Sequence, residues 1–97
     1  MITLKQACKI VELEAPDYYI SAIFNWKDRW IFGFRVIEDN SMPPDFGLQV
    51  MKESGRVCMF TPMICPHIRP KEKLFSANTF EDYEEKIKLI MDWKQNF

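Results

Sequence analysis

The sequence predicts an α+β fold: an antiparallel sheet of four or more strands, with an N-terminal and a C-terminal helix packed on one face. Three observations support this prediction. Apolar residues recur at helical spacing near each end of the chain, they alternate in the middle, and short polar turns separate the alternating runs. Strands joined by such short turns pair antiparallel, and helices that bury one apolar side pack best on one face of the sheet.

The size and composition of the chain fit one folded unit. A chain of 97 residues holds one hydrophobic core, so we expect a single domain over residues 1–97. Apolar residues make up 47% and charged residues 28%, close to the globular average, which excludes disorder over most of the chain. Eight Phe, three Trp and three Tyr compensate for the small size, because each ring can bury roughly 150–250 Å².

The first predicted element is a helix over residues 4–14. Thr3 and Gln6 have the spacing of a capping box, in which each side chain bonds the other residue's backbone amide. Pro16 lies just beyond the end and cannot continue the helix. Five small or apolar residues follow helical spacing: Leu4, Ala7, Cys8, Val11 and Ala15.

Two strands are predicted next, over Tyr18–Phe24 and Arg29–Ile37, and they are expected to pair through a polar turn at Asn25–Asp28. Large apolar residues alternate in the second strand, which is typical of a sheet with one well-buried side. A loop over Glu38–Gly47 follows. A second hairpin is then predicted, with strands over Leu48–Lys52 and Arg56–Phe60 and a turn at which Gly55 can take a positive φ.

The segment Thr61–Asn78 holds three prolines and shows no clean period. A structureless connection of this length is unusual in a small domain, so it either carries function or contains a short strand. Asn78 or Thr79 then caps a final helix. The apolar phase of all these elements predicts a core that is made of Leu4, Val11, Trp30, Phe32, Phe34, Val50, Val57, Phe80, Tyr83, Ile87 and Ile90.

Charge and hydropathy exclude several classes of partner. The formal net charge is −1 and the basic stretch Arg69–Lys73 has no aromatic row beside it, so no nucleic-acid partner is expected. No segment approaches the roughly 20 apolar residues that span a bilayer, so no membrane association is expected. The start of the chain lacks the pattern of a secretory signal. Three cysteines without framework spacing suit a reducing compartment, and we expect a cytoplasmic location.

The residues that could carry chemistry do not form a familiar catalytic or metal-binding pattern. Cys65 and His67 stand two apart around a proline, whereas nucleophilic Cys–His pairs come from distant segments. Cys58 could join them in a zinc site, with Cys8 as a further ligand, but the spacing matches no familiar zinc pattern. We therefore predict no cofactor, no metal and no enzymatic activity. A small thiol- or metal-dependent enzyme using Cys65 and His67 stays open as the alternative.

The two irregular loops are the candidate contact surfaces, because loops carry function more often than scaffold strands do. One loop is acidic and the other mixes apolar with basic residues, while a tryptophan in the first turn is a candidate interface anchor. The opposing interpretation is that Ile64 and Ile68 are buried and that the lysines only solubilise the rim. The candidate partner-binding residues are Trp26, Glu38, Asp39, Asp45, Ile64, His67, Arg69, Lys71 and Lys73.

One family resemblance runs through most of the chain. A helix ending in Ile10-Val11, the aromatic strand Trp30–Phe34, the approach Pro44–Gly47, the hairpin Val50–Val57 and a terminal helix come in this order. The chain thereby resembles the immunity-protein-35-like small immunity proteins of bacterial polymorphic toxin systems. That resemblance carries no catalytic motif. It implies a protein that protects the producing cell by occupying a cognate toxin, whose gene would lie beside its own.

The expected function is therefore that of a small cytoplasmic protein-binding domain, in its specific form an immunity protein that neutralises a cognate toxin by direct binding. A structural or oligomerisation domain is the second alternative beside the thiol or metal enzyme. The sequence leaves the oligomeric state and the identity of the partner open.

Overall fold

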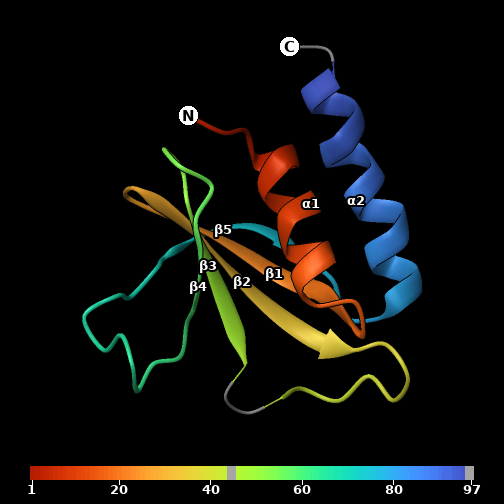
Figure 1. Ribbon diagram of the computed structural model, residues 1–97. Coiled ribbons are helices and arrows are strands. Elements are labelled where there is room, and N and C mark those ends of the chain that lie inside the picture. Colours follow the sequence, from red (N-terminus) through yellow and green to blue (C-terminus); the bar gives the residue numbers. More distant parts are fainter. Residues whose placement is uncertain (44–45, 96–97) are drawn as a thin grey trace.

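The computed structural model describes residues 1–43 and 46–95, with side chains described as far as residue 90. Two helices enclose a run of strands along the chain (Figure 1). In order, the elements are α1 (Leu4–Glu14), β1 (Tyr18–Trp26), β2 (Arg29–Val36), β3 (Gly47–Met51), β4 (Val57–Met59), β5 (Glu72–Ser76) and α2 (Phe80–Gln95).

The strands form one five-stranded sheet in the order β4-β3-β2-β1-β5, and every neighbouring pair is antiparallel. Both helices pack on one face of this sheet (Figure 1), and the core between them and the sheet draws residues from α1, α2 and four of the strands. The predicted α+β class is thus confirmed. We call the face that the helices leave uncovered the open face.

Helix α1 has the predicted bounds and the predicted cap. The Thr3 hydroxyl accepts from the Gln6 amide at 3.2 Å, and the Gln6 side chain accepts from the Thr3 amide at 2.8 Å. The start of the chain is tied down as well, because the Ile2 amide donates to the carbonyl of Lys52 at 2.8 Å. These contacts fix the helix against the turn between β3 and β4.

The first hairpin pairs the two predicted strands, but its turn is shorter than expected. Asn25 lies opposite Trp30 and Trp26 lies opposite Arg29, so both belong to β1. Only Lys27 and Asp28 make the turn, and Lys27 takes a positive φ of 44°. The prediction that Trp26 lies in the turn is therefore wrong. Because the turn has only two residues, the pairing of β1 with β2 continues as far as Trp26 and Arg29. Trp26 is half-buried and packs against apolar residues on the open face.

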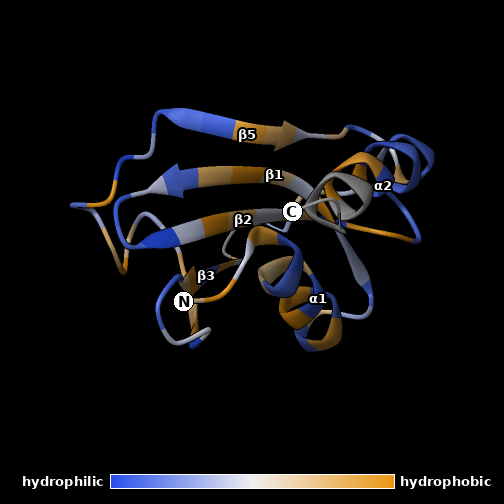
Figure 2. Cartoon of the chain, turned by 90° about the horizontal axis from the view of Figure 1, so that it is seen from above, coloured by the Kyte–Doolittle hydropathy of each residue, from blue (hydrophilic) through white to orange (hydrophobic). Residues whose placement is uncertain are grey.

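The core confirms the apolar phase of every element. All eleven predicted residues lie within the principal cluster or pack against it. The centres of β1 and β2 are hydrophobic and their ends at the turn are hydrophilic (Figure 2). Sequence analysis missed the contribution of β1, whose Tyr19, Ile20 and Ile23 are almost fully buried. A register shift between Ile20 and Ala22 places Ile20 and Ile23 on the same face, opposite Phe34 and Phe32, although they are three residues apart.

The long segment after β4 contains a short strand, β5, which was one of the two expectations for Thr61–Asn78. Because β4 and β5 lie at opposite edges of the sheet, residues 60–71 must cross it, and they do so over the open face. Two consecutive turns shape this crossing segment. The Cys65 amide donates to the carbonyl of Thr61 at 2.9 Å, and the Ile68 amide donates to the carbonyl of Cys65 at 3.1 Å. Each turn has proline at its second position, where the fixed φ favours a turn.

Helix α2 begins after Thr79, whose hydroxyl accepts from the Asp82 amide at 3.1 Å. Thr79 rather than Asn78 is thus the capping residue. One turn further on, Asp82 and Lys86 form an ion pair at 3.0 Å. The Tyr83 hydroxyl donates to the Glu12 carboxylate, which joins α2 to α1.

Candidate functional site

A row of small residues crosses the open face of the sheet. Gly47 of β3 lies opposite Gly33 of β2, Gly33 lies opposite Ala22 of β1, and Ala22 lies opposite Ser76 of β5. We call these four residues the small-residue row. The next row across the same strands carries large side chains, including Phe24 and Ile31, which face each other. The small-residue row therefore leaves a depression beside a wall of apolar side chains.

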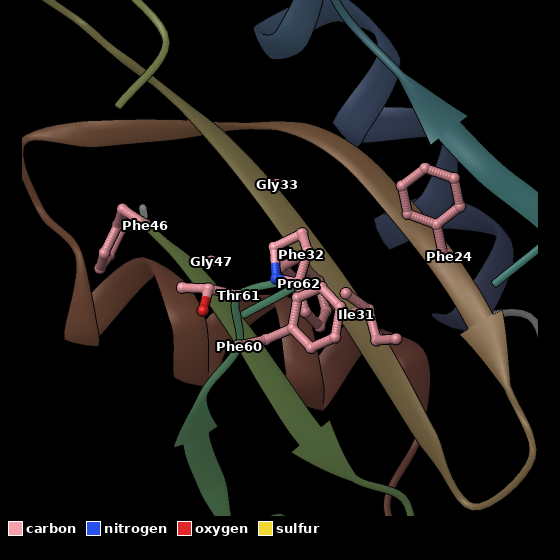
Figure 3. A pocket seen from close by; sticks show the side chains of 9 residues that line it. All are labelled: Phe24, Ile31, Phe32, Gly33, Phe46, Gly47, Phe60, Thr61 and Pro62. Carbon is pink, nitrogen blue, oxygen red and sulfur yellow. The ribbon is translucent and has the colours of Figure 1, made fainter. Parts of the chain in front are cut away.

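The crossing segment covers the wall but leaves the depression open. Cys65 and Ile68 are buried against Ile31, and Phe24, Trp26 and Phe60 pack around them. What remains is a pocket of about 160 Å³ over Gly33 and Gly47. Figure 3 shows Ile31 and Phe60 near its centre, with Phe46 at one end and Phe24 at the other. The described residues that line it are Phe24, Ile31, Phe32, Gly33, Phe46, Gly47, Phe60, Thr61 and Pro62.

The two irregular loops meet at this pocket. The Phe60 amide donates to the Gly47 carbonyl at 2.8 Å. A Cβ atom at position 47 would lie 2.8 Å from the Phe60 carbonyl oxygen, so glycine is needed for this approach. Gly33 differs, because a Cβ there would meet nothing nearer than the Ser21 hydroxyl at 3.7 Å. Gly47 thus allows the chain at Phe60 to pack closely against β3, while Gly33 leaves space in the pocket.

A buried polar side chain holds the crossing segment down. Gln49 of β3 lies under the segment and accepts from the Arg29 guanidinium at 2.6 Å. Its amide donates to the Met59 carbonyl at 3.1 Å and to the Cys65 sulfur at 3.6 Å. Because a buried amide is costly unless its hydrogen bonds are satisfied, these contacts fix the position of the segment.

The crossing segment exposes apolar side chains next to the pocket. Met63 is 86% exposed and Ile64 is 60% exposed, whereas Ile68 is buried. Met63 and Ile64 lie in the first turn, where the Ile64 amide donates to the Thr61 hydroxyl at 3.1 Å, whereas Ile68 ends the second turn and packs with Ile31. Figure 2 shows a hydrophobic stretch in this loop, away from both helices. The opposing interpretation, that Ile64 and Ile68 are both buried, is right for Ile68 and wrong for Ile64.

The predicted acidic residues lie apart from this surface. Glu38 and Asp39 are exposed in a turn after β2, on another side of the molecule from the crossing segment (Figure 1). The Asp39 carboxylate accepts from the Ser41 hydroxyl at 2.7 Å and from the Ser41 amide at 3.0 Å, and these bonds lower its pKa. Asn40 anchors the same turn by donating to the Asn78 carbonyl at 3.0 Å. Asp45 lies outside the described residues.

The predicted basic residues lie along the crossing segment and at the start of β5. Arg69, Lys71 and Lys73 are exposed. The Lys73 ammonium group lies 5.5 Å from the centroid of the Phe24 ring, so it stands beside the pocket. Trp26 carries a similar contact with Lys27 at 5.0 Å. The structure thus brings Ile64, Arg69, Lys71 and Lys73 to one face, together with the half-buried Trp26.

The Cys65–His67 pair is split by burial. The Cys65 thiol is buried and receives the Gln49 hydrogen bond, whereas His67 is exposed at the second turn. Within the described part of the chain, no group of three or more His, Cys, Asp or Glu side chains is arranged to hold a metal ion.

Ionisable groups buried in the core belong to the helix layer instead. Burial, together with the nearby Glu12 carboxylate, raises the pKa of Cys8 to about 12. Burial and the hydrogen bond to Glu12 raise the pKa of Tyr83 as well. Both groups lie on the helix side of the sheet, where Tyr83, Glu12 and Lys88 help to line a hollow of about 370 Å³. They stay neutral at ordinary pH and do not reach the open face.

The residues that form the pocket are not among the predicted contact residues. Gly33, Gly47 and Ala22 become neighbours only through the register of three strands, which the chain pattern does not reveal. One signal did exist: Ile31 stands between Trp30 and Phe32, so the strand is apolar on both faces. A strand of that kind indicates cover on its second face.

None of the helices in the described residues is long and apolar enough to cross a membrane. Comparison with known proteins adds no relative: no family model, no curated protein and no solved structure matches the chain.

Proposed function

We propose that this chain is a protein-binding domain and that its partner is bound on the open face of the sheet. The observation that carries the proposal is the pocket over Gly33 and Gly47, together with Met63 and Ile64 exposed on the adjoining loop. Exposed apolar side chains that cluster around a hollow are typical of interaction surfaces. Interfaces gain most of their energy where an apolar anchor fills such a hollow.

The chemistry of the pocket favours a binding surface over a catalytic site. None of the described residues that line it carries an ionisable side chain. Its volume of about 160 Å³ is also below the roughly 300–1,000 Å³ of small-molecule sites. The proposal gives no catalytic role to Cys65, whose thiol is buried, or to the exposed His67.

The resemblance to immunity proteins gives the proposal its specific form. The partner is then a toxin made by the same cell, which the chain neutralises by direct binding in the cytoplasm. This form names a candidate for the experiment, namely the protein encoded by the adjacent gene.

The test is a calorimetric titration of that protein with wild type and two double variants. Met63→Ser with Ile64→Ser removes the exposed apolar side chains beside the pocket. Leu13→Ser with Leu89→Ser removes equally exposed side chains from the helices, where Leu13 is 83% and Leu89 is 70% exposed. We expect the first pair to weaken binding about tenfold or more, since tenfold corresponds to ~1.4 kcal/mol and removing one hot-spot side chain costs about 2 kcal/mol or more. The second pair should bind as wild type does.

Two results would contradict the proposal. One is the absence of heat and of complex formation with the adjacent-gene protein. The other is a loss of affinity with the Leu13 and Leu89 variant alone, which would move the interface to the helix layer.

A further inference from the structure

We infer that the pocket on the open face takes a single aromatic side chain of the bound protein, carried in a segment with carboxylates beside it. This inference rests on the protein-binding function proposed above and specifies what the partner presents.

The volume of the pocket sets the size of the occupant. A cavity of about 150 Å³ in a protein interior is large enough for one benzene molecule. The pocket measures about 160 Å³, so one ring fills it and a second large side chain has no room. The small-residue row provides this space, because Gly33 and Gly47 place no side chain in it.

The walls of the pocket set the chemistry of the occupant. Phe24 and Phe60 supply aromatic rings, and Ile31 and Pro62 supply aliphatic surface. Aromatic rings gain from edge-to-face or offset contact with another ring, beyond the gain from burial alone. Among the described residues that line the pocket, only Thr61 carries a hydroxyl, and it accepts from the Ile64 amide at 3.1 Å. An occupant therefore needs no polar group inside the pocket.

Positive charge at the rim sets the flanking chemistry. The Lys73 ammonium group lies 5.5 Å from the centroid of Phe24, a wall residue, and Lys71 and Arg69 precede it along the chain. In the part of the chain that the structure describes, none of these three groups has a carboxylate within salt-bridge distance. The carboxylate of their neighbour Glu72 accepts a hydrogen bond from the Asn25 side-chain amide at 2.9 Å. Carboxylates beside the anchor ring would complement this rim and speed association at low salt.

The experiment uses three synthetic pentapeptides as probes. They are Asp-Asp-Phe-Asp-Asp, the matched basic peptide Lys-Lys-Phe-Lys-Lys, and Asp-Asp-Ala-Asp-Asp, which lacks the ring. Each is titrated up to about 5 mM into the ¹⁵N-labelled chain, a range that detects contacts as weak as those of one anchor residue. The readout is the amide resonances of Gly33, Gly47 and Thr61. We expect the acidic phenylalanine peptide to shift them, and the other two to bind about tenfold more weakly or not at all.

Two variants test the pocket and its rim separately. Gly33→Val fills the pocket without a backbone clash, because the nearest atoms to a Cβ there are 3.7 and 3.8 Å away. We expect it to abolish the shifts. Lys73→Glu should weaken binding of the acidic peptide about threefold or more, while Lys88→Glu, a matched charge reversal on the helix side, should leave it unchanged. Lys73 is exposed, so this variant keeps the test valid even if Gly33→Val unfolds the chain.

Several outcomes would overturn the inference. They are no shift with the acidic phenylalanine peptide, equal binding of the alanine peptide, or unchanged binding by Gly33→Val and Lys73→Glu. If the adjacent-gene protein still binds the open face in those cases, the proposed function stands and only the aromatic anchor falls. If the acidic phenylalanine peptide binds as expected but the adjacent-gene protein does not, the proposal that the partner is a toxin is wrong. The assignment of the pocket to an aromatic side chain is then still supported.

Discussion

Substituting alanine for each of the two glycines that face each other on β2 and β3 should change stability in opposite directions. At Gly47 the new Cβ would lie 2.8 Å from the Phe60 carbonyl oxygen and 3.3 Å from the Phe32 carbonyl oxygen. Both are backbone atoms held in the sheet or beside it, so neither can rotate away. At Gly33 the nearest atoms are side-chain atoms at 3.7 and 3.8 Å, which is ordinary contact.

The magnitude for Gly47→Ala follows from this crowding. Forcing an extra methyl group into a packed site typically costs ~1–3 kcal/mol. The strain falls on the 2.8 Å hydrogen bond from the Phe60 amide to the Gly47 carbonyl, whose loss adds about 1 kcal/mol. Alanine also lowers the conformational entropy of the unfolded chain, which stabilises the folded state by roughly 0.4–1 kcal/mol. We therefore expect a net loss of about 1–3.5 kcal/mol.

Gly33→Ala meets no clash, so only the effect on the unfolded chain applies. We expect a gain of roughly 0.4–1 kcal/mol. Urea unfolding followed by circular dichroism measures both variants, with equal m-values as the control that the transition is the same. In a domain of this size, 1 kcal/mol corresponds to about 4–8 °C in Tm. An unchanged midpoint for Gly47→Ala, or equal losses for both variants, would refute the assignment of Gly47 as the seat of the crossing segment.

Three further predictions concern the core, the pH response and the open face. Phe32→Ala should cost about 3–5 kcal/mol because Phe32 is fully buried, and an unchanged melting temperature would contradict its place in the core. Stability should fall as pH rises above about 9: Cys8, with a pKa of about 12, and Tyr83, with a raised pKa, keep their protons when folded but ionise earlier when unfolded. Tyr83→Phe should flatten this slope in melts recorded between about pH 8 and 10.5, and an equal slope would count against the cause. Gln49→Ala should cost about 1–3 kcal/mol in urea unfolding, because it removes the hydrogen bonds that Gln49 makes to Arg29 and to the Met59 carbonyl; a neutral effect would remove Gln49 as the support of the crossing segment.

The helices and hairpins could be predicted because their determinants are local. Thr3 and Gln6 make a cap within three residues, and Gly55 takes the positive φ of 77° that its turn requires. The eleven predicted core residues followed from periodicity alone. In each case neighbours along the chain carry the information.

The features that sequence analysis missed depend on contacts between distant segments. Strand β5 could not be recognised from its own residues, because Glu72, Lys73 and Leu74 are exposed and only its edge position gives it a partner. Trp26 was assigned to a turn because polar residues surround it, whereas its packing on the open face extends the strand. The pocket needed the register of Gly33 with Gly47, which no single segment encodes.

The predicted contact residues divide in the same way. Ile64, Arg69, Lys71 and Lys73 were recognisable from an irregular loop that mixes apolar and basic residues, and they lie on one face. Glu38 and Asp39 have the same local character but lie elsewhere, in a turn whose Asp39 carboxylate is used by Ser41. The composition of the two loops identified both sets of candidates. Only the order of the strands shows that the basic residues lie on the open face and that Glu38 and Asp39 do not.

The most direct test of the account is hydrogen–deuterium exchange of the chain with and without the protein encoded by the adjacent gene. If the partner binds the open face, exchange should slow at residues 57–64 and 46–48, where β4, the pocket and the exposed loop lie, and stay unchanged in α1 and α2. Protection confined to α1 and α2, with no change at the pocket, would contradict the assignment of the open face as the binding surface.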